Sequence, residues 1–225
     1  VEDSLKNTGL ERLDLIQLHC PPTDTFYRPE IFRLFEDLKQ EGKIANLGVS
    51  VEKVEEGLKA MQYDNVTTVQ IIFNVFRQRP AELFFREAEK NDIGIIVRVP
   101  LASGLLTGKF DQNSSFDKED HRNFNRNGEA FDKGETFSGI DFKTGLQAVD
   151  ELKSIFPKVE NLAPVALQWI LQHPQVSTII PGASKVEHLM SNLSLYERPD
   201  LTSEEINKMN AIYAEKIKPL VHQKW

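Results

Sequence analysis

The segments of this chain alternate between two hydrophobic patterns, and this alternation restricts the fold more than any other feature. Short, almost continuously apolar runs begin near residues 13, 44, 66, 93 and 177. Runs of this kind are typical of strands that are buried on both faces of a sheet. Apolar residues at helical spacing lie between them, as in "RPEIFRLFEDLKQEGK" and "VEKVEEGLKAMQ". Because parallel neighbours need a crossover connection, the sequence predicts an α/β fold with a parallel sheet.

The number of strands leaves two architectures open. An open, doubly wound sheet can be built from five strands, whereas a closed (β/α)8 barrel needs eight and typically ~250 residues. The chain has 225 residues and five strand-like runs, so the count alone slightly favours the open sheet. The length fits a single domain that spans residues 1–225.

Composition argues against several classes of protein. The formal net charge of −7 disfavours nucleic acid as a partner, because phosphate contacts need a basic face. No apolar run approaches the ~20 residues that span a bilayer, so no membrane segment is expected. Cys20 is the only cysteine, which excludes an internal disulfide and a cysteine metal cluster, and favours a reducing, cytoplasmic location.

Residues 101–138 interrupt the alternation. They are rich in Asn, Asp, Gly, Ser and Phe and show no hydrophobic period. A segment of this length without its own pattern is usually a functional loop or disordered. We expect it to contribute to the binding of a cofactor or substrate.

The glycine-bearing stretch "PLASGLLTGKF" follows the fourth predicted strand. It is not a P-loop, because its spacing is one residue short and Phe110 stands where the hydroxyl residue would be. A glycine-rich turn at the carboxyl end of a parallel strand still suits a pyrophosphate, whose oxygens need nearby backbone N–H groups. A simple turn is the alternative.

The stretch "STIIPGASKVEHLMSN" contains the fifth strand, a Pro-Gly turn and a helix that begins near Ser184. Lys185 and His188 would lie one turn apart on the exposed side of this helix, near its positive end. This arrangement would suit a phosphate monoester. An ordinary capped surface helix is the alternative.

Two polar residues interrupt the apolar strands, one at a strand end and one inside a strand. "LDLIQLHCPP" ends its strand on His19, whose imidazole can exchange a proton near neutral pH, although a structural histidine is the commoner case. Arg98 lies inside the otherwise apolar "IGIIVRVP". Because an unpaired guanidinium is costly to bury, we expect Arg98 to meet a ligand or a carboxylate.

Five motifs, in this order and at this spacing, resemble the aldo-keto reductase family. They are "GLERLDLIQLHCP", "GKIANLGVS", "VQIIFN", "VPLASGLLTGKF" and "IIPGASKVEHLMSN". The resemblance implies a (β/α)8 barrel in place of the open sheet. It also implies reduction of a small aldehyde or ketone with NADPH and without a metal. The first strand here resembles the fourth strand of the family, so the family's catalytic Asp, Tyr and Lys are expected before Val1.

The same resemblance assigns roles to individual residues. His19 matches the family's catalytic histidine, which orients and polarises the substrate carbonyl. Ser50 and Gln70 match contacts to the nicotinamide carboxamide, and Arg98 takes the place of an aromatic ring that often stacks on the nicotinamide. The residues that match the family's pyrophosphate loop are Leu101, Ser103, Gly104, Leu106 and Lys109. Those that match its adenosine-phosphate end are Gly182, Ser184, Lys185, His188 and Asn192.

Two positions depart from the family pattern. Val51 stands where the family often has Asn, and Arg98 where it often has an aromatic residue. A planar guanidinium can also stack, so Arg98 is kept as a cofactor contact. The departures leave two alternatives open: a catalytically silent nucleotide-binding or regulatory protein of the same fold, and an inactive fragment.

Overall fold

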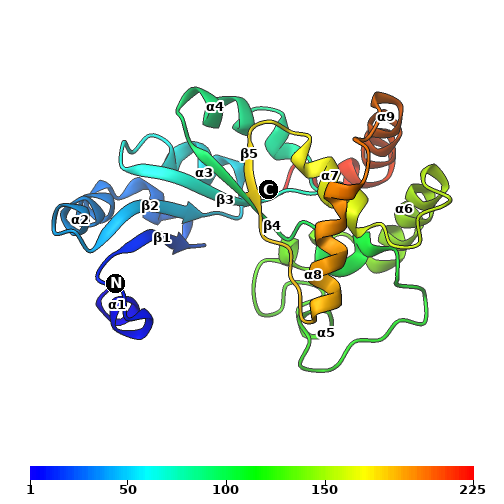
Figure 1. The fold of residues 1–225 in the computed structure, drawn as a ribbon, viewed down its shortest axis with the longest axis horizontal. Coiled ribbons are helices and arrows are strands. Elements are labelled where there is room, and N and C mark those ends of the chain that lie inside the picture. Colours follow the sequence, from blue (N-terminus) through cyan, green and yellow to red (C-terminus); the bar gives the residue numbers. More distant parts are fainter.

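A computed structural model describes residues 1–225 and contains one sheet of five parallel strands in the order β1-β2-β3-β4-β5 (Figure 1). The strands are β1 Leu13–His19, β2 Ile44–Ser50, β3 Val66–Ile72, β4 Gly94–Arg98 and β5 Val176–Ile179. These elements confirm the five strands and the parallel α/β arrangement that the alternating pattern predicts.

Helices connect the strands and continue beyond them (Figure 1). They are α1 Glu2–Thr8, α2 Pro29–Gln40, α3 Val54–Ala60, α4 Phe84–Lys90, α5 His121–Phe124, α6 Phe142–Ile155, α7 Ala163–Leu171, α8 Val186–Leu193, α9 Ser203–Ile212 and α10 Lys218–Val221. Helix α8 begins at Val186, two residues after the expected start near Ser184, because Lys185 is extended and forms its N-cap. No helix is long and apolar enough to cross a membrane.

The two faces of the sheet differ in character. Helices α2, α3, α4 and α7 pack on the strands, and alternate side chains of β2, β3 and β4 join the main hydrophobic core; these are Leu47, Val49, Val69, Ile71, Ile95 and Val97. Side chains alternate along a strand, so the residues between them point to the opposite face. That face carries polar side chains at the carboxyl ends of the strands.

The segment 101–138 is ordered by its aromatic residues. It contains three short 3₁₀ turns and α5 in place of longer elements. The Phe116 ring lies 5.2 Å from that of Phe110 and 5.8 Å from that of Phe137, measured between centroids. This cluster holds the segment against the first turn of α6, where Phe142 lies 5.1 Å from Phe137.

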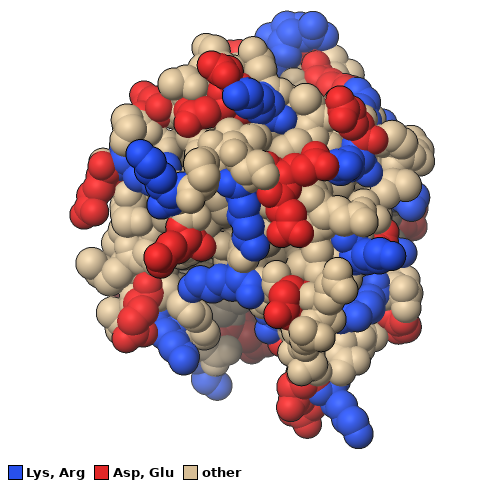
Figure 2. Space-filling view, turned by 90° about the vertical axis from the view of Figure 1, so that its right-hand side faces the viewer, with Lys and Arg blue, Asp and Glu red and all other residues tan.

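Charges are mixed on the molecular face that Figure 2 shows. Lys and Arg alternate with Asp and Glu across this view, and neither sign forms a continuous patch. The face drawn in Figure 2 therefore carries no broad basic patch.

Candidate functional site

Four of the predicted site residues project from neighbouring strands at one edge of the sheet. His19 ends β1, Ser50 ends β2, Gln70 lies near the end of β3, and Arg98 ends β4. The strand register pairs His19 with Ser50, and Ser50 with Gln70. All four occupy the face opposite the core-facing residues. Ligands of parallel α/β folds bind at this carboxyl edge of the strands.

The environments of these side chains differ. His19 is exposed, whereas Ser50 is 1% exposed and its hydroxyl lies 3.6 Å from the Cys20 thiol. Gln70 Nε2 donates a hydrogen bond to Gln17 Oε1 at 2.9 Å. Nε2 of Gln17 is buried without a partner. The edge therefore presents an accessible imidazole beside amide groups with unused hydrogen-bonding capacity.

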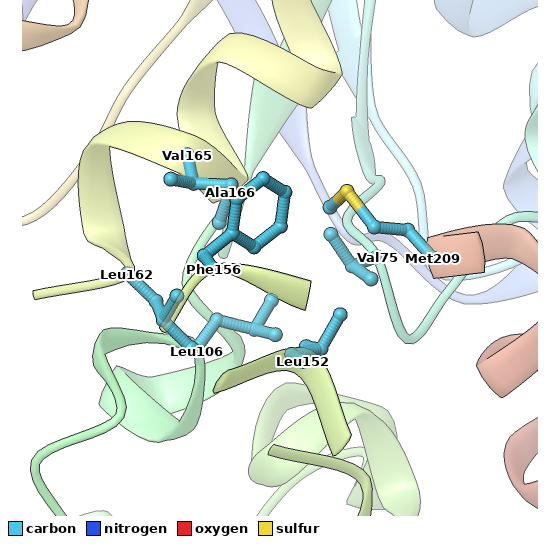
Figure 3. Close-up of a pocket in the computed structure, with 8 residues that line it drawn as sticks. All are labelled: Val75, Leu106, Leu152, Phe156, Leu162, Val165, Ala166 and Met209. Atoms are coloured by element: carbon cyan, nitrogen blue, oxygen red, sulfur yellow. The ribbon is translucent and has the colours of Figure 1, made fainter. Parts of the chain in front are cut away.

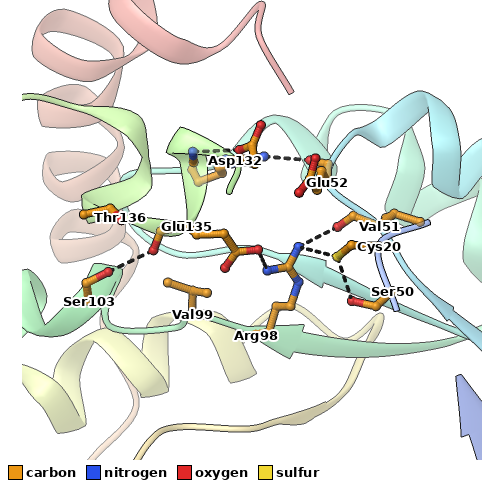
Figure 4. Close-up of polar contacts among 12 residues, drawn as sticks. Cys20, Ser50, Val51, Glu52, Arg98, Val99, Ser103, Asp132, Glu135 and Thr136 are labelled. Atoms are coloured by element: carbon orange, nitrogen blue, oxygen red, sulfur yellow. Dashed lines mark hydrogen bonds and ion pairs between the residues drawn. The ribbon is translucent and has the colours of Figure 1, made fainter. Parts of the chain in front are cut away.

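Arg98 is the most highly connected of the four residues (Figure 4). Its guanidinium forms an ion pair with Glu135 and donates from Nη2 to the Val51 carbonyl at 2.9 Å. The same nitrogen lies 3.5 Å from Cys20 Sγ. The sequence leaves a ligand or a carboxylate as the partner of Arg98, and the structure provides a carboxylate. Nε of Arg98 is buried without a partner.

The thiol and carboxylates around Arg98 form a compact cluster. One ligand atom each of Cys20, Glu52 and Glu135 lies within 4.8 Å of the others. The Arg98 guanidinium contacts both Cys20 and Glu135, so it already supplies a positive charge there. Burial raises the pKa of the Cys20 thiol and also the pKa of the Glu52 carboxyl. We therefore assign this cluster to the positioning of Arg98.

The turn after β4 has a strained backbone. Val99, Ala102 and Ser103 have φ angles of 51°, 47° and 56°, in the left-handed region that non-glycine residues rarely enter. Ser103 Oγ donates to the Glu135 carbonyl at 2.9 Å and accepts from the Phe137 N–H at 3.2 Å. Strain of this kind persists where the surrounding contacts fix it, and it concentrates at functional sites.

Asn74 is a positioning residue that the sequence analysis does not identify. It is fully buried, and its Nδ2 donates to the Val99 carbonyl at 3.0 Å and to Ser138 Oγ at 2.9 Å. Its Oδ1 accepts from the Phe76 N–H at 2.8 Å. The available signal is that "VQIIFN" ends an apolar strand on an amide. Glu135 gives no comparable signal, because it lies in the polar segment 101–138.

The other residues of the expected pyrophosphate loop lie on this turn in different environments. Leu101 and Gly104 are half-buried, Lys109 is exposed, and Gly104 packs so closely that a Cβ there would lie 3.1 Å from the Phe110 ring. Leu106 is 1% exposed and lines a small apolar cavity of about 10 Å³ with Val75 and other core residues (Figure 3). Its side chain therefore belongs to the core, and only its backbone could contact a cofactor.

The expected adenosine-phosphate residues lie after β5, the strand next to β4. Gly182, Ser184, Lys185 and His188 are exposed, and Ser184 Oγ lies 3.3 Å from His188 Nδ1. Asn192 is 6% exposed, and its Nδ2 has no partner. Since buried polar groups are nearly always hydrogen-bonded, this free amide is consistent with a ligand site at α8.

The model of the aldo/keto reductase family matches residues 1–214. The uncharacterized oxidoreductase YqkF of Bacillus subtilis is 29% identical over 94% of this chain and 63% of its own length. The L-glyceraldehyde 3-phosphate reductase of Escherichia coli (strain K12) is 25% identical over 96% of this chain and 62% of its own length. The chain thus spans a little under two thirds of these relatives.

Solved structures agree with the sequence matches. A glycerol dehydrogenase from Gluconobacter oxydans superposes with a TM-score of 0.73 and 29% identity, over 96% of this chain and 63% of the other. The holo form of an aldo-keto reductase from Bacillus halodurans gives a TM-score of 0.70 at 24% identity, over 94% and 64%. The fold matches (β/α)8 barrels, which replaces the open doubly wound sheet that strand counting slightly favours. The chain belongs to the aldo/keto reductase family.

Proposed function

We propose that this chain carries the nucleotide site of an NADPH-dependent carbonyl reductase, which converts a small aldehyde or ketone to the alcohol. The observation that carries the proposal is the alignment of His19, Ser50, Gln70 and Arg98 on one face, at the carboxyl ends of four adjacent strands. The reductase and dehydrogenase names of the relatives support it.

The side chains fit a nicotinamide nucleotide. Ser50 and Gln70 offer a hydroxyl and an amide to the nicotinamide carboxamide, and Arg98 has a buried Nε without a partner. The backbone of the strained turn at Leu101, Ser103, Gly104, Leu106 and Lys109 would hold the pyrophosphate. When bound, NADPH supplies the hydride that reduces the carbonyl carbon.

The residues at the start of α8 support NADPH over NADH as the cofactor. Lys185 and His188 are exposed beside Ser184, and two potential cations near a helix N-terminus favour a phosphate. Gly182 and Asn192 complete this group. We therefore expect NADPH to bind more tightly than NADH. As the only cysteine is Cys20, we also propose a reducing, cytoplasmic location.

His19 orients and polarises the substrate in this proposal. The exposed imidazole at the end of β1 would donate a hydrogen bond to the carbonyl oxygen and so stabilise the negative charge that develops there. The resemblance implies that a tyrosine is the acid that protonates this oxygen.

Replacement of His19 tests the proposal. In the full-length protein, with NADPH and a panel of small aldehydes, we expect His19→Ala to lower kcat on the order of 10²-fold, as for loss of a group that assists proton transfer. His19→Gln keeps an N–H donor, so its kcat should lie between those of the wild type and His19→Ala. Binding of NADPH should be unchanged in both variants. An unchanged kcat in His19→Ala would exclude the catalytic role of this residue.

A nucleotide-binding protein without turnover is the second candidate. It is favoured by Val51, which lacks the amide often found there, and by the ion pair that already occupies Arg98. This candidate predicts saturable NADPH binding with no oxidation of NADPH by any aldehyde of the panel.

A further inference from the structure

The ion pair of Arg98 and Glu135 links the sheet edge to the segment 101–138. The two residues are 37 positions apart in sequence, and the Arg98 side chain is 8% exposed while that of Glu135 is 21% exposed. The Glu135 carbonyl accepts from Ser103 Oγ at 2.9 Å. Glu135 therefore contacts an expected nicotinamide neighbour through its side chain and an expected pyrophosphate neighbour through its backbone (Figure 4).

Glu135 is the carboxylate that contacts Arg98, although other charges lie near. Glu52 is half-buried beside the same cluster, and its carbonyl accepts from Arg77 Nη2 at 2.7 Å. Burial, with a smaller contribution from Arg98, lowers the pKa of Arg77 to about 9, while Asp132 opposes this shift. Two guanidinium groups thus share a poorly hydrated region, and a positive charge there interacts strongly with its neighbours.

A nicotinamide ring changes its charge with its oxidation state. The ring is neutral in NADPH and carries one positive charge in NADP⁺. A bare guanidinium beside the ring would therefore repel the oxidised form and leave the reduced form almost unaffected. Arg98 stands at the carboxyl edge on the same face as Ser50 and Gln70, where the proposed function places this ring.

We propose that Glu135 sets the preference of the site for oxidised over reduced nicotinamide, by neutralising Arg98 where the ring binds. This inference rests on the proposed function and adds a residue that determines which oxidation state is held. With Glu135 ionised, the Arg98 pair has no net charge, and NADP⁺ can lie beside it. Without Glu135, Arg98 acts against NADP⁺ specifically.

Glu135→Gln is the direct test, because glutamine keeps the shape of the side chain and the backbone contact to Ser103. We expect the Kd of NADP⁺ to rise on the order of tenfold, from one unneutralised charge at close range. The Kd of NADPH should change by less than about twofold, since the reduced ring is neutral. Fluorescence titration for NADPH and calorimetry for NADP⁺ give the two constants. Glu129→Gln is the matched control, because this exposed glutamate of the same segment bonds only with Asn127.

Arg98→Met provides a second test of opposite sign. It leaves the Glu135 carboxylate unneutralised, and this negative charge should favour the positively charged ring of NADP⁺. The ratio of the NADPH Kd to the NADP⁺ Kd should therefore rise in Arg98→Met, whereas it should fall in Glu135→Gln. The double variant should return this ratio to near the wild-type value, as expected for a directly coupled pair.

The outcomes separate the two proposals. If the wild type binds NADPH but the ratio of the NADPH Kd to the NADP⁺ Kd is unchanged in both single variants, the role of Glu135 is overturned and the proposed function stays intact. A wild-type protein that binds neither nucleotide would overturn the proposed function and, with it, this inference. Equal weakening of NADP⁺ and NADPH in Glu135→Gln would show that Glu135 only supports the loop, and would also overturn the inference.

Discussion

The amide of Asn74 joins three segments that meet at the carboxyl edge of the sheet. Its hydrogen bonds reach Val99, Ser138 and Phe76, and it is fully buried. Asn74→Ala leaves the Phe76 N–H without its acceptor, so we expect a loss of roughly 2 kcal/mol or more in the free energy of unfolding. Urea denaturation measures this loss.

Asn46→Ala is the control for this prediction. Asn46 makes one exposed hydrogen bond, from its Nδ2 to the Asp14 carbonyl at 3.0 Å, so its removal should cost less than about 1 kcal/mol. Equal losses in the two variants would contradict the role that we assign to Asn74.

Single residues were predictable where a pattern was broken. His19 and Arg98 stand out because a polar group interrupts an apolar run. Ser50 and Gln70 lie at or near the carboxyl ends of predicted strands, where ligand sites are expected, but only the resemblance gives them a role. Glu135 could not be found at all, because one carboxylate among many polar residues of a long loop shows no partner until the chain is folded.

At the scale of elements, α5 depends on the carboxylate of Asp120. Asp120 caps this helix by accepting from the Arg122 N–H at 2.9 Å, and it also forms an ion pair with the Arg122 side chain. These contacts with Arg122 lower the pKa of Asp120 to about 2. The unfolded value is about 3.9. The contribution of Asp120 to stability is therefore complete above about pH 4 and is lost as the pH falls towards 2.

Asp120→Asn tests this dependence. We expect the difference in melting temperature between the wild type and Asp120→Asn to be largest above about pH 4 and to shrink between pH 4 and 2. Asp117→Asn is the control, because this carboxylate accepts from the Glu119 N–H at 2.9 Å and has no arginine partner. A difference that stays constant over this range would show that the ion pair does not stabilise the fold.

Elements with regular patterns were predictable, and irregular ones were not. The spacing of Thr202 and Glu205 predicts a capping box, and the structure confirms it with Glu205 N–H donating to Thr202 Oγ1 at 3.2 Å. The segment 101–138 has no such pattern, and its 3₁₀ turns lie in a segment held by tertiary contacts among Phe110, Phe116 and Phe137. No local pattern encodes contacts of that kind.

Over the whole molecule, exposed apolar side chains gather on α8 and on the 3₁₀ turn that follows it. Between 47% and 75% exposed are Val186, Leu189, Met190 and Leu193 on α8, and Tyr196 in the turn. Strands β1 and β5 are the two edges of the sheet. Exposed apolar clusters and free strand edges both favour association between chains.

We therefore expect a polypeptide of residues 1–225 to self-associate with rising concentration. The double variant Val186→Lys with Met190→Lys should shift sedimentation velocity profiles towards the monomer. Leu34→Lys is the control, since Leu34 is 60% exposed on α2, away from this cluster. A wild-type polypeptide that stays monomeric at all concentrations would contradict the prediction.

The sequence pattern predicted the parallel α/β class of the fold, but it did not predict the relation of the sheet to a closed barrel. Alternating patterns indicate parallel strands with crossover helices, because each type of element buries its apolar residues with its own period. The order of the strands and the barrel relationship depend on contacts between distant segments. For these, the resemblance to a family succeeded where counting strands favoured the wrong architecture.

The central claim is that the carboxyl edge of the sheet binds a nicotinamide nucleotide, and an NADPH titration tests it most directly. With the wild type, the change in NADPH fluorescence should saturate. In Gln70→Ala, which removes the amide that we propose binds the nicotinamide, saturation should need an at least about tenfold higher NADPH concentration. Thr67→Ala, on the same strand but bonded to the Leu47 carbonyl, should behave as the wild type. Absence of saturable binding by the wild type, or equal binding by Gln70→Ala, would contradict the account.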